Sequence, residues 1–221
     1  MKLLLASGNA HKFREFTVFF QQYQAFTAHG VEFAVPDAGF LAHSGIAVPA
    51  DIEETGDTYE KNALIKARVW ADASGLPAIA DDSGLEVRAL SWAPGIRSAR
   101  AIAGSDRDRA DWLLSEMAGT ADRRACFVAN LVIAFPGTQR ALHGGRDYFS
   151  VEGRCWGTIA HTCAGDNGFG YDPVFIPDGF NRTFGELPAE DKSRISHRAI
   201  AMGGLAQILP SVLKYQTVRQ L

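Results

Sequence analysis

The segment ACFVANLVIAF at residues 125–135 constrains the fold more than any other part of the chain. It is almost wholly apolar, which is typical of a strand buried on both faces, so we expect it at the centre of a β-sheet. Further strands are predicted at residues 2–6, 77–81, 139–143 and 147–154, and helices near 10–24, 58–74, 106–118 and 190–209. This order predicts a mixed sheet with helices on both faces, which is the α/β class.

Two helix starts carry a capping signal. Asp57, followed three positions later by Glu60, resembles a capping box for helix 58–74. Asp106 is expected to cap helix 106–118. The pair Gly203-Gly204 is expected to weaken the last helix near its end.

The composition is that of an ordinary globular protein, with 221 residues of which 47% are hydrophobic. This length predicts one domain, residues 1–221, or one domain with two lobes. The formal net charge of −3 argues against a protein that coats DNA or RNA, because such domains usually carry a basic face. A local basic pocket for one small polyanion remains compatible with this charge.

Cysteine usage and hydropathy favour a cytoplasmic protein. The three cysteines form no even framework, and the apolar stretch in MKLLLASGNAHK is far shorter than the core of a signal peptide. No apolar run is long enough to span a bilayer. Cys155, His161 and Cys163 lack the usual zinc spacing and an evident fourth ligand, so we interpret them as incidental.

A strand, the turn SGN at residues 7–9 and a helix follow one another at the start of the chain. The free backbone N–H groups at such a helix start can bind a phosphate, and Lys12 would add a positive charge. Taken alone, this pattern also fits an ordinary strand–turn–helix unit without a ligand, and by itself it favours that interpretation.

The segment AIADDSGLEV at residues 78–87 ends an apolar run in two adjacent carboxylates, Asp81 and Asp82, followed by a turn at Ser83-Gly84. Carboxylates at the end of a strand are typical of a cation site, although Asp-Asp-Ser-Gly is also a good turn sequence. The chain also has an acidic IEETG segment and scattered lysines. Carboxylates for Mg²⁺ and lysines for phosphates are what a nucleoside triphosphate requires. There is no Walker A motif and no kinase glycine-rich loop.

Six segments, in order, carry a family resemblance: ASGNAHKFREF, ETGDTYEKNALIKA, GLPAIADDSGLEVRAL, APGIRSARAIAG, GFGYDPVFIPDG and EDKSRISHRAIA. They resemble the inosine triphosphatase, or Ham1-like, family of nucleotide pyrophosphatases. The resemblance covers nearly the whole chain and implies Mg²⁺-dependent hydrolysis of dITP, ITP and XTP to the monophosphate and pyrophosphate. It also implies an elongated, two-lobed α/β fold with a central cleft, usually in a homodimer.

The resemblance implies a role for each matching residue. Asp82 would be the general base, and Glu54, Asp81 and Asp82 would hold Mg²⁺. The triphosphate would be held by Ser7, Gly8, Asn9, Ala10, His11, Lys12 and Lys66, with Ser83 close to the phosphates. The rest of the nucleotide would contact Phe169, Gly170, Tyr171, Asp172, Lys192, His197 and Arg198.

In this assignment Phe169 stacks on the purine, while His197 and Arg198 donate to the purine 6-oxygen. Hypoxanthine and xanthine carry a carbonyl there, whereas adenine carries an amino group that leaves such donors unsatisfied. A mismatch of this kind can cost on the order of 10²-fold in selectivity. From spacing alone, a basic pair on a helix surface and a core phenylalanine would be the simpler interpretations.

The chain departs from the family pattern in three places: a longer segment at 34–50, Ser91-Trp92 where small glycines are common, and Gly185 where alanine is usual. None of these is a proposed catalytic position, so they affect substrate preference at most. Two alternatives remain: a related Maf-type pyrophosphatase acting on pyrimidine nucleotides, and a nucleotide-binding module that has lost hydrolysis. The segments at 79–87 and 192–198 argue against the first, and the presence of Glu54 and Asp82 argues against the second.

Overall fold

The computed structural model describes residues 1–7, 9–36, 52–137 and 147–217. Within these residues, six strands form one mixed sheet in the order β2-β1-β3-β4-β5-β6, which confirms the predicted α/β class. The strands are β1 (Lys2–Leu5), β2 (Glu32–Ala34), β3 (Ala78–Val87), β4 (Arg124–Ala134), β5 (Tyr148–Ile159) and β6 (Phe175–Pro177). β1 pairs in parallel with β2 and β3, and β5 pairs antiparallel with β6.

The chain divides into two compact units, and β3, β4 and β5 contribute residues to both. Unit 1 comprises Met1–Asp82, Asn130–Glu152 and Ala201–Leu221. Unit 2 comprises Ser83–Ala129 and Gly153–Ile200. The prediction of a single domain with two lobes around one cleft stays a prediction.

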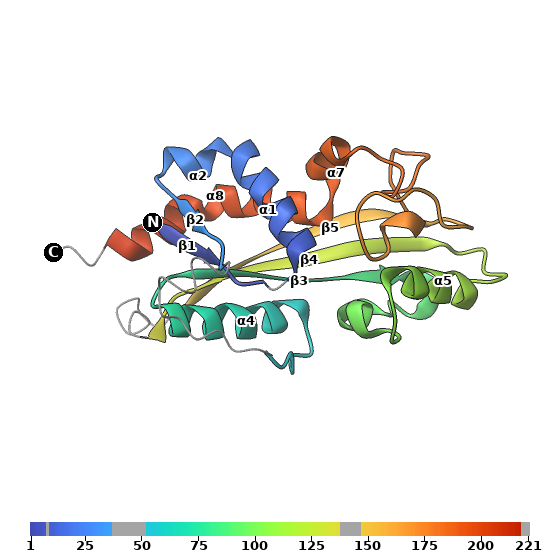
Figure 1. Ribbon diagram of the computed structural model, residues 1–221, viewed down its shortest axis with the longest axis horizontal. Coiled ribbons are helices and arrows are strands. Elements are labelled where there is room, and N and C mark those ends of the chain that lie inside the picture. Colours follow the sequence, from blue (N-terminus) through green and yellow to red (C-terminus); the bar gives the residue numbers. More distant parts are fainter. Residues whose placement is uncertain (8, 37–51, 138–146, 218–221) are drawn as a thin grey trace. The chain divides into compact units, whose positions relative to one another are not determined.

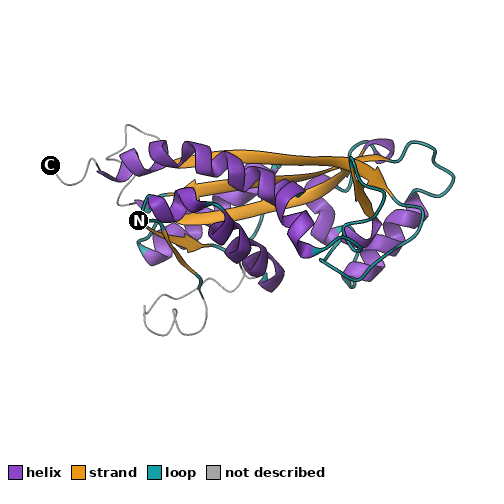
Figure 2. Cartoon of the chain, turned by 90° about the horizontal axis from the view of Figure 1, so that it is seen from above, coloured by secondary structure: helices purple, strands orange, loops and turns teal. Residues whose placement is uncertain are grey.

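Unit 1 carries helices on both faces of its strands. α4 (Tyr59–Ser74) covers one face, and α1 (Ala10–Gln22), α2 (Gln24–Ala28) and α8 (His197–Thr217) lie on the other (Figures 1 and 2). α4 can approach the sheet closely because its buried stripe is mostly alanine. That stripe packs with β1, β3 and β4 in a core that includes Leu4, Ala63, Ala67, Trp70, Ala71, Ala78, Ala80, Val132 and Ala134.

Unit 2 has its own apolar core. α5 (Asp106–Glu116) lies on one face of its strands and α7 (Ala189–Ile195) on the other (Figure 1). The short 3-10 helices of this unit are η1 (Arg88–Leu90), η2 (Gly95–Arg100) and η3 (Asp172–Val174). The core includes Leu85, Val87, Leu113, Met117, Phe127, Tyr171, Phe175, Phe184 and Leu187.

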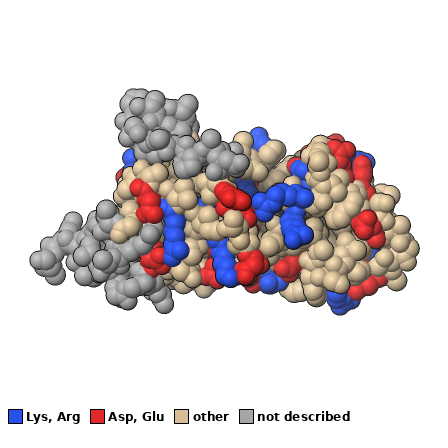
Figure 3. All heavy atoms as spheres, turned by 90° about the horizontal axis from the view of Figure 1, so that it is seen from below, with Lys and Arg blue, Asp and Glu red and all other residues tan. Residues whose placement is uncertain are grey.

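β4 confirms the prediction made from ACFVANLVIAF. Every residue of this strand after Arg124 is buried, and the strand lies between β3 and β5. The predicted strand at 139–143 lies outside the described residues. No helix among the described residues is both long and apolar enough to cross a membrane. Figure 3 shows acidic and basic side chains interspersed on one face of the molecule.

Both predicted helix caps are wrong by one residue. The N-cap of α4 is Thr58, whose hydroxyl accepts from the Lys61 backbone N–H, while Asp57 forms an exposed ion pair with Lys61. The N-cap of α5 is Ser105, which forms a capping box with Asp108. In each case two neighbouring residues can cap, and the residue with extended backbone geometry does so.

Two further predictions, a turn and a continuous helix, also differ from the structure. Ser83-Gly84 is not a turn, because β3 continues from Ala78 to Val87. The single helix predicted at 190–209 is two helices: α7 ends at Ile195, Ser196 has extended backbone, and α8 begins at His197. α8 then passes through Gly203-Gly204 and Pro210 without ending. Tertiary packing therefore overrides the local turn and glycine signals here.

Two of the three family departures fall on described residues. Ser91 and Trp92 both have positive φ, 54° and 68°, a backbone region that glycine adopts without steric cost. Gly185 has no room for a side chain, because a Cβ there would lie 2.5 Å from the Ala164 carbonyl oxygen. Most of the longer segment at 34–50 lies outside the described residues.

Candidate active site

The start of α1 is occupied by its own cap. The Asn9 side-chain oxygen accepts from the backbone N–H groups of His11 and Lys12, at 2.8 and 3.3 Å. The Asn9 N–H in turn donates to the Ser7 hydroxyl at 3.1 Å. The N–H groups predicted to be free for a phosphate are thus held by Asn9, which a phosphate would have to replace. Ala10 and His11 are exposed at this helix start, and Gly8 lies outside the described residues.

Lys12 reaches from α1 to Asp81 within β3. Its ammonium nitrogen lies 2.7 Å from Oδ2 of Asp81 and 3.3 Å from the Asp81 carbonyl oxygen. The Asp81 carboxylate is almost completely buried. An ion pair of this kind offsets the desolvation of the carboxylate and places a cation beside the paired aspartates.

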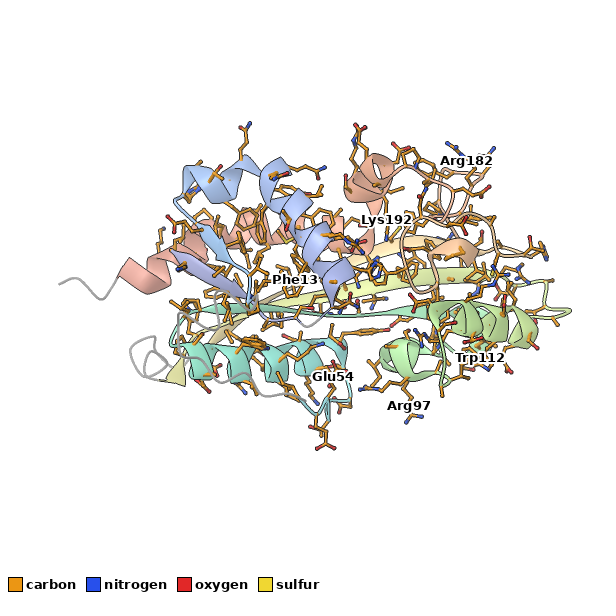
Figure 4. The ribbon with its side chains drawn as sticks, in the orientation of Figure 1. Phe13, Glu54, Arg97, Trp112, Arg182 and Lys192 are labelled. Carbon is orange, nitrogen blue, oxygen red and sulfur yellow. The ribbon has the colours of Figure 1, made fainter. Side chains whose placement is uncertain are left out.

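Lys66 joins two further carboxylates. Its nitrogen lies 2.8 Å from Oε1 of Glu54 and 2.8 Å from Oδ1 of Asp82. Glu54 lies in the segment that leads into α4 (Figure 4), so one lysine of α4 links that segment to β3. Lys12, Glu54, Lys66, Asp81 and Asp82 together form what we call the carboxylate–lysine cluster.

Burial and charge perturb the pKa values in this cluster. Burial raises the pKa of Asp82 above its usual value, and the adjacent Lys66 only partly opposes this. Burial alone would lower the pKa of Lys66, but the charges of Asp82 and Glu54 outweigh it and raise that pKa. Asp82 is therefore a more basic carboxylate than an exposed aspartate, which suits a general base.

The donor set of the cluster suits a hard divalent cation. Glu54, Asp81 and Asp82 supply only carboxylate oxygens, which Mg²⁺ prefers. Oδ2 of Asp82 is buried and accepts no hydrogen bond from the described residues. The described residues contain no ready-made group of three or more His, Cys, Asp or Glu side chains around one metal position. The carboxylates thus fit a cation chemically, while in this structure they bind lysines.

In unit 2, Phe169 is the centre of a second group of predicted residues. Its ring lies 5.0 Å from the Lys192 nitrogen and 5.1 Å from the Arg198 guanidinium carbon. Arg198 also donates to the Ser83 hydroxyl at 2.6 Å. Lys192, on α7 (Figure 4), donates to Oδ2 of Asp172 at 2.6 Å. Ser83, Phe169, Asp172, Lys192 and Arg198 form what we call the Phe169 cluster.

Three predicted base-site residues are placed differently. Tyr171 is buried in the unit 2 core and its hydroxyl donates to the Ser98 carbonyl oxygen at 3.0 Å. Burial raises the pKa of Tyr171 to about 12. The His197 ring stacks on Phe127 with centroids 4.8 Å apart and is only 2% exposed. Gly170 takes part through its backbone N–H, which donates to Asp106.

Two contacts of these groups were missed from the sequence. Asn62, fully buried on α4, accepts from the Gly56 N–H at 2.8 Å and so fixes the segment that carries Glu54. Its position four residues before Lys66 on the same helix is a signal that could have found it. The bond from Gly170 to Asp106 joins residues 64 apart, and no local pattern predicts it.

Fold and site together define a class of protein: an α/β protein with buried carboxylates on a central strand paired to lysines, suited to a polyanion and a cation. A family model described as the Ham1 family matches residues 3–208. The chain is 42% identical to a dITP/XTP pyrophosphatase of Prochlorococcus marinus (strain MIT 9313), covering 97% of this chain and 94% of that protein. It is 40% identical to a dITP/XTP pyrophosphatase of Streptomyces coelicolor, covering 96% and 98%.

A solved structure supports the same assignment. A HAM1 protein from Coxiella burnetii matches with a TM-score of 0.77 and 33% sequence identity, over 96% of this chain and 99% of that one. The chain therefore belongs to the Ham1 family.

Proposed function

We propose that this protein hydrolyses non-canonical purine nucleoside triphosphates, dITP, ITP and XTP, to the monophosphate and pyrophosphate, and so removes them from the nucleotide pool. The relatives named dITP/XTP pyrophosphatase support this proposal. The observation that carries it is the carboxylate–lysine cluster, in which Asp82 is buried with a raised pKa beside Lys66.

The cluster acts on the triphosphate. Asp82 accepts a proton from the attacking water, the α–β phosphoanhydride bond breaks, and pyrophosphate leaves. Lys12 and Lys66 turn from their carboxylates toward the phosphate oxygens and stabilise the charge that develops there. From the family resemblance, we assign Ser7, Gly8, Asn9, Ala10, His11 and Ser83 to contacts with the phosphates.

Glu54, Asp81 and Asp82 would hold Mg²⁺, in keeping with their all-oxygen donor set and the buried Oδ2 of Asp82. When bound, Mg²⁺ neutralises phosphate charge and polarises the phosphorus–oxygen bonds. Before the nucleotide binds, Lys66 orients Glu54 and Asp82, since both carboxylates bind its ammonium group.

The Phe169 cluster recognises the base. Phe169 offers its ring face to the purine, and Arg198, with His197, donates to the 6-oxygen. Lys192 reaches the nucleotide from α7, and the backbone from Gly170 to Asp172 lines the base site. The contact of two cations with one ring supports this assignment, because a purine that displaces them from the ring face leaves them close to its edge, where they can donate hydrogen bonds.

We also propose that the protein acts as a cytoplasmic homodimer with residues 1–221 as one catalytic domain. The family resemblance of the sequence is the support for this arrangement. Light scattering coupled to size exclusion measures the mass of the particle in solution. A mass of one chain at working concentration contradicts the dimer.

One assay tests the function. ITP, XTP, dUTP and ATP are incubated side by side, with pyrophosphate and orthophosphate measured separately. We expect rapid release of pyrophosphate from ITP and XTP, loss of activity in EDTA and recovery on adding Mg²⁺. Activity that survives EDTA, or release of orthophosphate with a diphosphate product, contradicts the mechanism. Preference for dUTP identifies a Maf-type enzyme, and binding of ITP without turnover identifies a non-hydrolysing module.

A further inference from the structure

Two consecutive backbone N–H groups next to the Phe169 ring each donate to a carboxylate. The Phe169 N–H donates to Oδ2 of Asp172 at 2.7 Å, and the Gly170 N–H donates to Oδ2 of Asp106 at 2.7 Å. These two bonds therefore fix the backbone N–H groups that precede and follow the Phe169 carbonyl. One anchor is local, and the other comes from α5.

The local anchor closes a tight turn. Asp172 also accepts from Lys192 at 2.6 Å and is 2% exposed. Gly168 has φ of +78°, and a Cβ there would lie 2.0 Å from Oδ2 of Asp172. The Asp172 carboxylate thus occupies the space that a side chain would take, and this fixes the first half of the turn.

The distant anchor is held rigidly by its helix. Asp106 is the first residue of α5, and the N-terminal end of that helix is capped without it, because Ser105 and Asp108 form the capping box. The other oxygen of Asp106 binds Arg109, which also donates to the Gly104 carbonyl oxygen at 2.8 Å. α5 is fixed in the core by the fully buried Ala110 and Leu113. The carboxylate of Asp106 is therefore available for Gly170 and is held in one place.

We propose that Asp106 is a positioning residue for base recognition, which holds the Phe169–Gly170 backbone so that the Phe169 ring is set before the nucleotide binds. This inference rests on the proposed function, in which Phe169 stacks on the purine. Without Asp106, the Gly170 end of the turn must be ordered at the moment of binding. Ordering that backbone opposes nucleotide binding, whereas the phosphate chemistry of Asp82 does not depend on it.

The experiment compares three variants with the native protein. Asp106→Ala removes the acceptor for Gly170, and Asp106→Asn removes the charge but keeps an oxygen that can accept. Asp111→Ala is the matched control, because Asp111 lies on the same helix and also pairs with an arginine, Arg107. For each protein we measure kcat and KM for ITP, the inhibition constant of tripolyphosphate, which has no base, and the thermal midpoint.

For Asp106→Ala we expect KM for ITP to rise about tenfold, with kcat within about twofold of the native value. Asp106→Asn and Asp111→Ala should both stay near the native KM. The inhibition constant of tripolyphosphate should be unchanged in all three. A merely structural role would move the thermal midpoint, kcat and tripolyphosphate inhibition together.

A native KM in Asp106→Ala overturns the proposal, and so does an equal rise for ITP and tripolyphosphate. A KM in Asp106→Asn as high as in Asp106→Ala also overturns it, because the charge would then matter and not the acceptor. Failure of the native protein to hydrolyse ITP is a different outcome, since it rejects the proposed function itself.

Discussion

In the carboxylate–lysine cluster of unit 1, both lysines bind carboxylates, with Lys12 on Asp81 and Lys66 on Glu54 and Asp82. In the Phe169 cluster of unit 2, Lys192 also binds a carboxylate, that of Asp172, but Lys192 and Arg198 both lie over an aromatic ring, and Arg198 donates to a hydroxyl. A ligand of the first cluster must compete with full negative charges, so that cluster responds to charge. A ligand that stacks on Phe169 must displace these cations from the ring and can then accept hydrogen bonds from them, so that cluster responds to shape and hydrogen bonding.

The largest expected effect comes from a substitution in the carboxylate–lysine cluster. Asp82→Asn keeps the size of the side chain but removes its charge and its ability to accept a proton. We expect kcat for ITP to fall on the order of 10²-fold or more, while triphosphate binding is retained or strengthened because repulsion is relieved. Single-turnover kinetics and equilibrium binding measure the two quantities separately.

Asp57→Asn is the matched control for this change, because Asp57 is an exposed acid in an ion pair with Lys61. It should keep the native kcat. Turnover by Asp82→Asn at near the native rate would show that another group is the base.

The second-largest expected effect is a change in the selectivity between ITP and ATP. Arg198→Ala removes a donor that ITP uses and ATP does not, so kcat/KM should fall more for ITP than for ATP, by roughly 1–3 kcal/mol of differential effect. Phe169→Ala should lower both by similar factors, since every purine has a stacking face. The measurement is kcat/KM for both nucleotides in both variants.

Arg198→Lys sharpens this comparison, because it keeps the charge and loses the planar guanidinium. If geometry decides, its ITP/ATP ratio should resemble that of Arg198→Ala. Equal loss for both nucleotides in Arg198→Ala would make Arg198 a phosphate or structural residue.

The smallest expected effect is on the free energy of unfolding alone, at a residue outside both clusters. Ser91 has φ of 54°, a conformation that costs a non-glycine residue energy in the native state. After allowing for the greater freedom of glycine in the unfolded chain, Ser91→Gly should raise the free energy of unfolding by about 0.5 kcal/mol. This corresponds to a rise of about 1–2 °C in Tm, measured by calorimetry.

Kinetic constants for ITP should not change in Ser91→Gly. Trp92 is a less suitable site for this test, because its ring also contacts Trp156 at a centroid distance of 6.2 Å. A lower Tm in Ser91→Gly would mean that the serine side chain contributes more than its backbone costs.

The centre of the sheet was predictable from the sequence because its signals are local and strong, whereas the short strand β2 was not predicted. The apolar run of β4 and the helical periodicity of α1 and α4 need no distant information. The caps at Thr58 and Ser105 were missed, since adjacent residues were equally capable. The continuation of β3 through Ser83-Gly84 depends on pairing with neighbouring strands, which turn chemistry does not report.

The sequence predicts a set of candidate site residues but not their partners. The family resemblance named Lys12, Lys66 and Asp82, and the structure shows which carboxylate each lysine binds. Such pairs join residues 69 and 16 positions apart, and no periodicity encodes them. The role of Asp106 is harder still to predict, because it acts through a backbone N–H that every residue except proline carries.

The pairing of the lysines decides which solutes can compete for the first cluster. Its two ammonium groups face three carboxylates, so with all five groups ionised the net charge is 2 − 3 = −1. A lone anion such as orthophosphate or a nucleoside monophosphate meets like charge and gains little by displacing a carboxylate from its lysine. A triphosphate bound to a divalent cation supplies phosphate oxygens for the lysines and a positive ion for the carboxylates at the same time. The ion pairs of the resting state thus discriminate against the abundant smaller phosphates and favour departure of the monophosphate once pyrophosphate has been cut from it.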